Sequence, residues 1–266
     1  MIYLNAVNVD IAGTLALQIE GTECGDLIAV TDDTGGGPSD AKAIFIGAFI
    51  GDVNSGMNLS ATGFNYRTSI IDAMFGQPTI SRVEIRGNGG DDHIRLGDEI
   101  TQQSTLSGGS GNDNIRGGSG KATILGGASH DLLIGGGADD VLIGGNGDDA
   151  LVGLSGADRA FGGNGNDWIA GGADSDALLR GGNGNDRISG GAGGDRLLGD
   201  AGNDVLYRDG SDLLVSGGNS VFTPPDPVDD ALNELIDEFW DDLFVTDGDD
   251  DGALDTLDEL IDSILP

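Results

Sequence analysis

GGSGNDNIR at residues 108–116 opens a run of eleven nine-residue units that ends at Tyr207. The sixth place is Asp in ten of the eleven units, with Ala122 as the exception, and the eighth place is apolar in all of them. The extra residue Arg180 breaks the run once. Disorder imposes no spacing, so this period predicts a repeat fold. The other units read GGSGKATIL, GGASHDLLI, GGGADDVLI, GGNGDDALV, GLSGADRAF, GGNGNDWIA, GGADSDALL, GGNGNDRIS, GGAGGDRLL and GDAGNDVLY.

Each unit combines a glycine-rich turn with a very short strand. Glycine permits positive φ angles and the close approach of neighbouring turns, and the last three places form a strand with one inward side chain. One unit cannot bury its single apolar residue, so the units must stack. We predict a mainly β fold, a right-handed parallel β-roll (β-solenoid) with two units per turn and a length of roughly 25 Å. Its apolar interior is thin, so another source of stability is required.

The units match the pattern GGxGxDxUx, in which U is apolar, and the region resembles the RTX, or haemolysin-type, calcium-binding nonapeptide repeats. The resemblance extends weakly to GNGGDDHIR at 87–95 and to DGSDLLV at 209–215. It implies a parallel β-roll with several Ca²⁺ ions between turns stacked on the same side, two units apart. One loop would give the carbonyls of places two and four and its Asp. The loop two units later would give those of places one and three and its Asp.

Carried over to this chain, the resemblance implies that Gly145, Gly147 and Asp149 share an ion with loop 162–167. All-oxygen ligation by six or more groups suits Ca²⁺ better than Mg²⁺. The implied metal ligands of the array are Gly109, Gly111, Asp113, Gly126, Gly127, Ala128, Asp131, Gly136, Ala138, Asp140, Gly144, Gly145, Asn146, Gly147, Asp149, Gly153, Ser155, Asp158, Gly162, Gly163, Asn164, Gly165, Asp167, Gly171, Ala173, Asp176, Gly181, Gly182, Asn183, Gly184, Asp186, Gly190, Ala192, Asp195, Gly199, Ala201 and Asp204.

Some units depart from the pattern. Ala122 removes one carboxylate, so we expect ions next to the 117–125 loop to be weak or absent. Arg180 is expected to shift one strand and to cause a local bulge. Five units replace a turn glycine, a change that keeps the carbonyl group but puts the backbone geometry in question; the replacing residues are Ser129, Ala138, Asp174, Leu154 and Asp200.

The composition and the missing motifs exclude several classes of function. Asp and Glu number 46 against 12 Lys and Arg, a formal net charge of −34, so nucleic acid is not an expected partner. Cys24 is the only cysteine, which excludes an internal disulfide and a cysteine zinc site. The sequence has no GxSxG or HExxH motif, and His93 and His130 are expected to be surface groups. We predict no enzymatic activity; a carboxylate-based glycan enzyme or a carbohydrate-binding adhesin on a β-solenoid is the alternative.

Four regions are expected along the chain. Residues 1–107 contain apolar stretches of strand length and are predicted to form a β-rich N-terminal cap on the roll; a separate ligand-binding domain is the alternative. Residues 108–222 form the roll, and the proline-rich segment 223–228 is a linker. Residues 229–266 carry helical apolar spacing, as at Leu232, Leu235, Ile236 and Phe239, and predict a helix–loop–helix.

A second calcium motif lies between those two predicted helices. DGDDDGALDTLD at 247–258 resembles an EF-hand loop, with Gly252 at its sixth place. Asp stands at the twelfth place instead of the usual Glu, as in dockerin-like relatives, which puts the strength of the site in doubt. An acidic helix–loop–helix without metal is the alternative. The resemblance implies Asp247, Asp249, Asp251, Ala253, Asp255 and Asp258 as ligands.

The ninth place of each unit should point outward if the eighth points inward. One sheet would then expose Leu125, Ile143, Phe161, Leu179 and Leu198, and the other a mixed set. We hypothesise that the C-terminal helices or a second subunit cover the apolar set; filling of a tolerant site with strand-forming residues is the alternative.

The whole sequence indicates a calcium-binding protein whose repeats fold as Ca²⁺ binds. We expect a secreted or cell-surface structural or interaction module, with calcium, a second copy of the chain, or a cell-surface or glycan partner as binding partners. MIYLNAVNVD at the start has no signal-peptide pattern. We therefore expect either a signal lost before this numbering or an export route that uses none.

Overall fold

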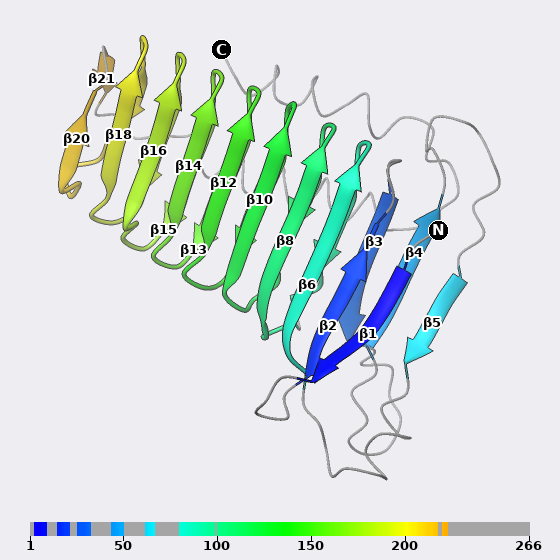
Figure 1. The fold of residues 1–266 in the computed structure, drawn as a ribbon. Coiled ribbons are helices and arrows are strands. Elements are labelled where there is room, and N and C mark those ends of the chain that lie inside the picture. Colours follow the sequence, from blue (N-terminus) through cyan, green and yellow to red (C-terminus); the bar gives the residue numbers. More distant parts are fainter. Residues whose placement is uncertain are drawn as a thin grey trace, which may run out of the picture.

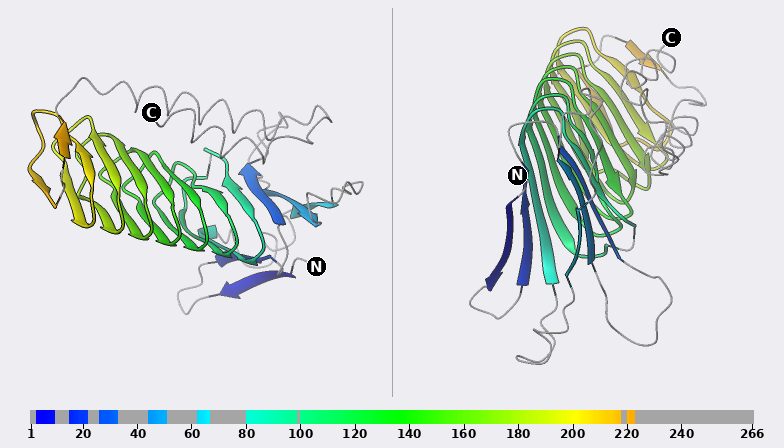
Figure 2. Two further views of the ribbon diagram at one scale, coloured as in Figure 1. Left: turned by 90° about the horizontal axis from the view of Figure 1, so that it is seen from above. Right: turned by 90° about the vertical axis from the view of Figure 1, so that its right-hand side faces the viewer.

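A computed structural model describes residues 3–9, 15–21, 26–32, 44–50, 62–66, 80–98, 100–217 and 220–222 of the chain. These residues form two sheets that lie face to face along an elongated body (Figures 1 and 2). The predicted helix–loop–helix and the EF-hand-like loop at 247–258 lie outside the described residues. Among the described residues, no helix is long and apolar enough to cross a membrane.

The two sheets are named here by the strands they contain. The first sheet has the order β1 (Tyr3–Val9), β2 (Leu15–Glu20), β6 (Ile80–Gly89), β8 (Gln103–Ser110), β10 (Ala122–Ala128), β12 (Val141–Asn146), β14 (Arg159–Asn164), β16 (Leu178–Asn183), β18 (Arg196–Ala201), β20 (Leu214–Ser216). The second has the order β21 (Ser220–Phe222), β19 (Val205–Tyr207), β17 (Arg187–Gly191), β15 (Trp168–Ala173), β13 (Ala150–Ser155), β11 (Leu132–Gly136), β9 (Asn114–Arg116), β7 (His93–Leu96), β3 (Asp26–Asp32), β4 (Ile44–Ile50), β5 (Thr62–Tyr66).

Successive strands of the repeat alternate between the two sheets, and each pairs in parallel with the strand two units away. Ile124 of β10 is in register with Leu142 of β12, and Leu133 of β11 with Leu151 of β13. Both pairs are separated by two nine-residue units. The predicted parallel β-roll with two units per turn is therefore confirmed.

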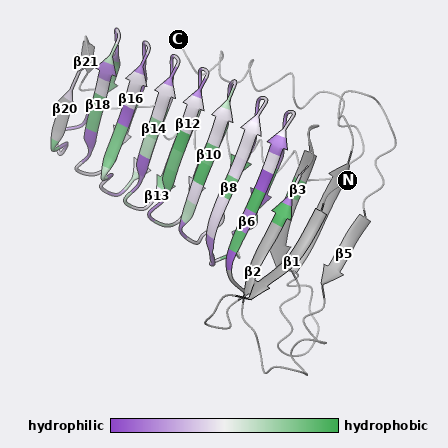
Figure 3. Ribbon diagram, in the orientation of Figure 1, coloured by the Kyte–Doolittle hydropathy of each residue, from purple (hydrophilic) through white to green (hydrophobic). Residues whose placement is uncertain are grey.

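The eighth place of each unit fills the interior between the sheets. Leu133, Leu142 and Leu151 are all 0% exposed. Burying a side chain of this size contributes about 1.5–3 kcal/mol, but each turn provides only two of them. In Figure 3 the hydrophobic colour lies mainly within the strands of the roll. The interior is as thin as the repeat predicts.

The extra residue of the array is Ala177, and not Arg180 as expected from the spacing. Ala177 and Leu178 both donate their N–H groups to the carbonyl of Asp158, at 2.9 and 3.4 Å, so the bulge lies in the turn before β16. Leu179 then takes the eighth place and is 0% exposed. Arg180 takes the outward ninth place and pairs with Phe161 in register. The assignment of Leu178 to the core and of Leu179 to the outer face was wrong.

The N-terminal strands are continuous with the roll. β2 pairs in parallel with β6, and β3 in parallel with β7, whereas β1, β4 and β5 join by antiparallel pairing. These strands therefore extend both sheets of the roll, and the N-terminal cap at residues 1–107 stays a prediction. Parallel pairing also begins well upstream of residue 108.

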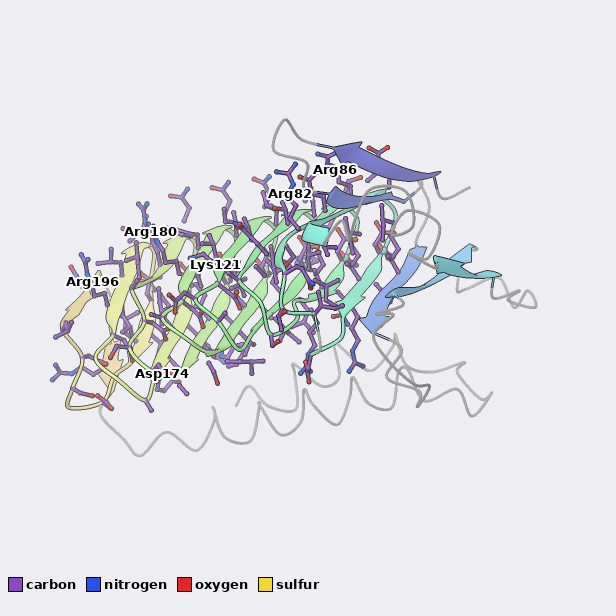
Figure 4. All side chains as sticks on the ribbon, turned by 90° about the horizontal axis from the view of Figure 1, so that it is seen from below. Arg82, Arg86, Lys121, Asp174, Arg180 and Arg196 are labelled. Atoms are coloured by element: carbon purple, nitrogen blue, oxygen red, sulfur yellow. The ribbon has the colours of Figure 1, made fainter. Side chains whose placement is uncertain are left out.

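The outer faces of the two sheets differ in exposure. On the first sheet, Ile143 is 36% exposed, and the guanidinium of Arg159 lies 5.6 Å from the ring centre of Phe161. Arg82, Arg86, Arg180 and Arg196 also lie along this side of the roll (Figure 4). On the second sheet, the outward residues of β9 to β17 are mostly buried. The hypothesis that the C-terminal helices or a second subunit cover the apolar set of the first sheet stays a prediction, and within this chain Ile143 of that set is exposed.

Candidate metal centre

The sixth-place Asp residues form two stacks, one on each edge of the roll. Each backbone N–H donates to Oδ1 of the Asp one turn further on, as from Asp131 to Asp149 and from Asp149 to Asp167, both at 2.9 Å. The first stack contains Asp113, Asp131, Asp149, Asp167, Asp186 and Asp204. The second contains Asp140, Asp158, Asp176 and Asp195.

The second oxygen of these carboxylates is buried without a partner. Oδ2 of each of the ten stacked Asp residues has no hydrogen-bond partner within the part of the chain that the structure describes. The side chains themselves are buried, with residue exposures of 3% or less. A buried, unpaired anionic oxygen carries a large desolvation cost. A row of such oxygens therefore requires either protons or cations.

Burial raises the pKa of nine of the ten stacked carboxyl groups. The pKa of Asp149 rises from 3.8 to about 7, because burial penalises the charged form more than the hydrogen bond from Asp131 stabilises it. The pKa of Asp131 rises to about 8, with the charges of Asp113 and Asp149 adding to the effect of burial. A nearby divalent cation would reverse this shift.

The first two glycines of each unit are needed because a side chain there would collide with a carboxylate or with the next turn. A Cβ atom at Gly144 would overlap Oδ2 of Asp149, and a Cβ at Gly162 would overlap Oδ2 of Asp167. At the second place, Gly163 has a φ of +123° and a Cβ there would overlap the carbonyl oxygen of Gly145 one turn away. The first glycine of a unit thus makes room for the carboxylate, and the second allows two turns to stack.

The structure stacks the loops of two predicted ligand sets of the array directly on one another. Gly147 donates its N–H to the carbonyl of Asn164 at 2.8 Å, and Asp149 stacks on Asp167 as described above. The corresponding loops at 108–113 and 126–131 are joined in the same way, from Gly111 to the carbonyl of Ala128 at 3.2 Å. The predicted oxygens therefore lie in directly stacked turns.

The match to a known family fits this geometry. The model of the RTX calcium-binding nonapeptide repeat (4 copies) matches residues 83–99, 104–133, 119–151, 143–178 and 178–206. This region is an RTX calcium-binding repeat array. Comparison with curated proteins and with solved structures gave no significant match. The match at 83–99 also confirms the weak upstream resemblance at 87–95.

The RTX array has no conventional cluster of metal-binding side chains. Among the described residues, no group of three or more His, Cys, Asp or Glu side chains converges on one point. This agrees with the expected ligand set, because each pair of stacked loops supplies only two carboxylates. In that expected set the remaining oxygens are backbone carbonyls, which are hard ligands suited to Ca²⁺.

Most residues that replace a turn glycine of the RTX array keep the left-handed backbone conformation. Ser129, Leu154, Asp174 and Asp200 have φ angles of +82°, +76°, +75° and +67°, so a side chain is tolerated there. The loops at 117–122 and 135–140 are different, because none of their residues adopts this region. Ala122, where the carboxylate is missing, is the last residue of the first loop. Its N–H still donates to Oδ1 of Asp140, the last residue of the second loop, at 2.6 Å.

The two histidines have different environments. His93 is 6% exposed, so its expectation as a surface group was wrong, and burial lowers its pKa to about 4. His130 is exposed at the fifth place of its loop, where Nδ1 accepts the N–H of Asp148 at 2.8 Å. It occupies a position that Asn112 and Asp148 fill in the turns on either side. Its role there is a hydrogen-bond acceptor between turns.

Proposed function

We propose that this chain is a secreted or cell-surface module that folds when several Ca²⁺ ions bind between the stacked turns of its RTX array. The observation that carries this proposal is the row of buried Asp Oδ2 atoms that lack a partner within the described residues. A calcium ion between two loops would neutralise two carboxylates and bind only the stacked form, so its binding free energy becomes folding free energy.

In this proposal the chain's own residues supply all the ligands. Asp149 and Asp167 provide carboxylate oxygens, and the carbonyls of Gly145, Gly147 and Gly162, with that of Asn164, complete the set. The same arrangement repeats along both Asp stacks, except next to Ala122. We also propose a separate calcium site at 247–258, and we assign no catalytic role to the chain.

The calcium concentration would act as the switch. In a calcium-poor cell interior, the carboxylates repel and the thin core does not offset the chain entropy, so the array stays unfolded. In a calcium-rich exterior it folds. A chain that crosses a membrane unfolded and folds outside is consistent with the typical export of RTX proteins.

A calcium titration of the full chain followed by calorimetry and circular dichroism tests this proposal. Asp149→Asn should remove a ligand and raise the calcium concentration needed for folding several-fold. Asp148→Asn is a matched control, because Asp148 is exposed and its Oδ1 accepts the N–H of Asn166, a role that Asn can keep. Asp247→Asn, measured in the same titration, tests the separate calcium site proposed at 247–258. A chain that stays fully folded after metal removal at neutral pH, with no heat of calcium binding, would disprove the proposal.

A further inference from the structure

The outer face of the second sheet is buried, although the roll itself leaves it open. Ile134 and Val152 are 0% exposed and Ala170 is 2% exposed. They alternate along their strands with Leu133, Leu151 and Ile169, which fill the interior. Both sides of β11, β13 and β15 are therefore covered. We call the outward residues of β9 to β17 the covered face.

The described strands do not account for this burial. The N-terminal strands β3, β4 and β5 extend the second sheet by edge pairing, and they continue it sideways at one end (Figures 1 and 2). The first sheet lies on the opposite, inner side. Within the part of the chain that the structure describes, no element lies over this face.

The covered face has an apolar centre with basic and polar ends. Its centre consists of Leu132, Ile134, Ala150, Val152 and Ala170. At one end, Arg95 and Arg116 are in register on β7 and β9, and at the other end Arg187 is on β17. The face is complementary to an acidic, amphipathic segment.

Buried polar atoms add to this evidence. Asn114 is 3% exposed, and within the described residues neither atom of its side-chain amide has a hydrogen-bond partner. His93, in register with it on β7, is 6% exposed and its Nδ1 likewise lacks one there. Buried polar groups are nearly always paired. A segment that docks here is therefore expected to bring polar groups to this end of the face.

We propose that residues 229–246 of the same chain dock on the covered face as an amphipathic helix. This segment has seven Asp and Glu residues, no Lys or Arg, and apolar residues at helical spacing. As a helix its 18 residues would span about 27 Å, which matches the roughly 24 Å from β9 to β19 at ~4.8 Å per strand. The apolar side would contact Ile134 and Val152, and the acidic residues would lie near Arg116 and Arg187.

The length of chain available favours this occupant. Residues 223–266 follow directly after β21, at the edge of the second sheet. The undescribed stretches between β3 and β6 are 33–43, 51–61 and 67–79. Each of them joins strands at the N-terminal end and is too short to reach β15 and return. Only the C-terminal segment combines the length, the charge and the apolar spacing.

Cysteine reactivity in the full chain tests the proposal. In a Cys24→Ser background at saturating Ca²⁺, Val152→Cys and Ala170→Cys place a thiol on the covered face. Ile143→Cys places one on the exposed face of the first sheet as a matched control. We expect the first two thiols to react with a maleimide at least tenfold more slowly than the control. Adding Leu235→Asp and Ile236→Asp should raise their rates at least tenfold and leave the control rate unchanged.

Three outcomes would overturn the proposal. Thiols at 152 and 170 that react as fast as the control would show that the face is open. Protection that survives the Leu235→Asp and Ile236→Asp changes would assign the cover to another segment. Protection that is lost on dilution, with a dimer mass by light scattering, would assign it to a second copy. The test is made on calcium-saturated protein with unchanged circular dichroism, so its failure leaves the proposed calcium function untouched.

Discussion

Removing calcium should unfold the RTX array at pH 8, and mild acid should restore it without metal. In the folded chain burial raises the pKa of Asp149 from 3.8 to about 7. The folded state then binds more protons than the unfolded state between these two values, so its stability falls as the pH rises through this window. A rise of the pKa from 3.8 to about 7 corresponds to about 4 kcal/mol per carboxyl group.

Several buried carboxyl groups contribute in this way, and together they determine whether the metal-free array is folded. The pKa of Asp113, Asp140, Asp158 and Asp167 is raised to about 7 in the same way. Three groups at about 4 kcal/mol each would remove most of the 5–15 kcal/mol that stabilises a typical domain. Lowering the pH to 5.5 would return about 2 kcal/mol per group.

The assay is far-ultraviolet circular dichroism of metal-stripped protein between pH 8 and pH 5.5, which stays above the isoelectric point of about 4.1. Calcium-saturated protein, folded at both values, is the control. Added NaCl should restore less structure than acid, because burial, which salt does not screen, is the first cause of the shifts. Metal-free protein that is folded at pH 8, or unfolded at pH 5.5, would refute the reasoning.

Two further predictions concern single loops. Gly163→Ala should lower the free energy of unfolding in calcium by at least about 1–3 kcal/mol from backbone strain alone. Gly137→Ala is the control, because a Cβ there would have no neighbour closer than 3.8 Å, and it should change the free energy of unfolding by less than about 0.5 kcal/mol. Equal thermal denaturation curves for the two variants would contradict this prediction. Ala122→Asp should restore the missing carboxylate beside Asp140, and calorimetry should then count one more Ca²⁺ than in the parent chain; an unchanged count would show that the backbone of loops 117–122 and 135–140 prevents binding.

The roll and both Asp stacks could be predicted from the sequence because each depends on a period alone. A nine-residue unit with one apolar place fixes the alternation between sheets, and the same period aligns Asp131 with Asp149. The use of one carboxylate oxygen as a hydrogen-bond acceptor for the next turn could not be predicted. It depends on the distance between stacked backbones, which places Oδ1 2.9 Å from a particular N–H group and leaves Oδ2 without a partner in the described residues.

The position of the extra residue shows where spacing alone fails. Four residues, 177–180, lie between Asp176 and the next glycine pair, and the period permits either Leu178 or Leu179 in the core. Packing decides, because Leu179 is in register with Ala160 and Leu197. A signal was present in the sequence: a charged residue directly before the glycine pair suits the outward ninth place. Arg180 occupies that place and pairs with Asp200.

The exposure of the outer faces could not be derived from the repeat, because in our proposal it depends on a contact between distant parts of the chain. The ninth place of the first sheet is the more apolar, yet Ile143 is exposed there. On the second sheet the apolar residues Ile134, Val152 and Ala170 are consecutive along the roll, with arginine at either side. Comparing the two sheets by the overall apolar character of their ninth-place residues does not reveal this order. A segment that binds a face recognises the order of residues along it, so under our proposal the short apolar centre between basic ends marks the face that the segment binds.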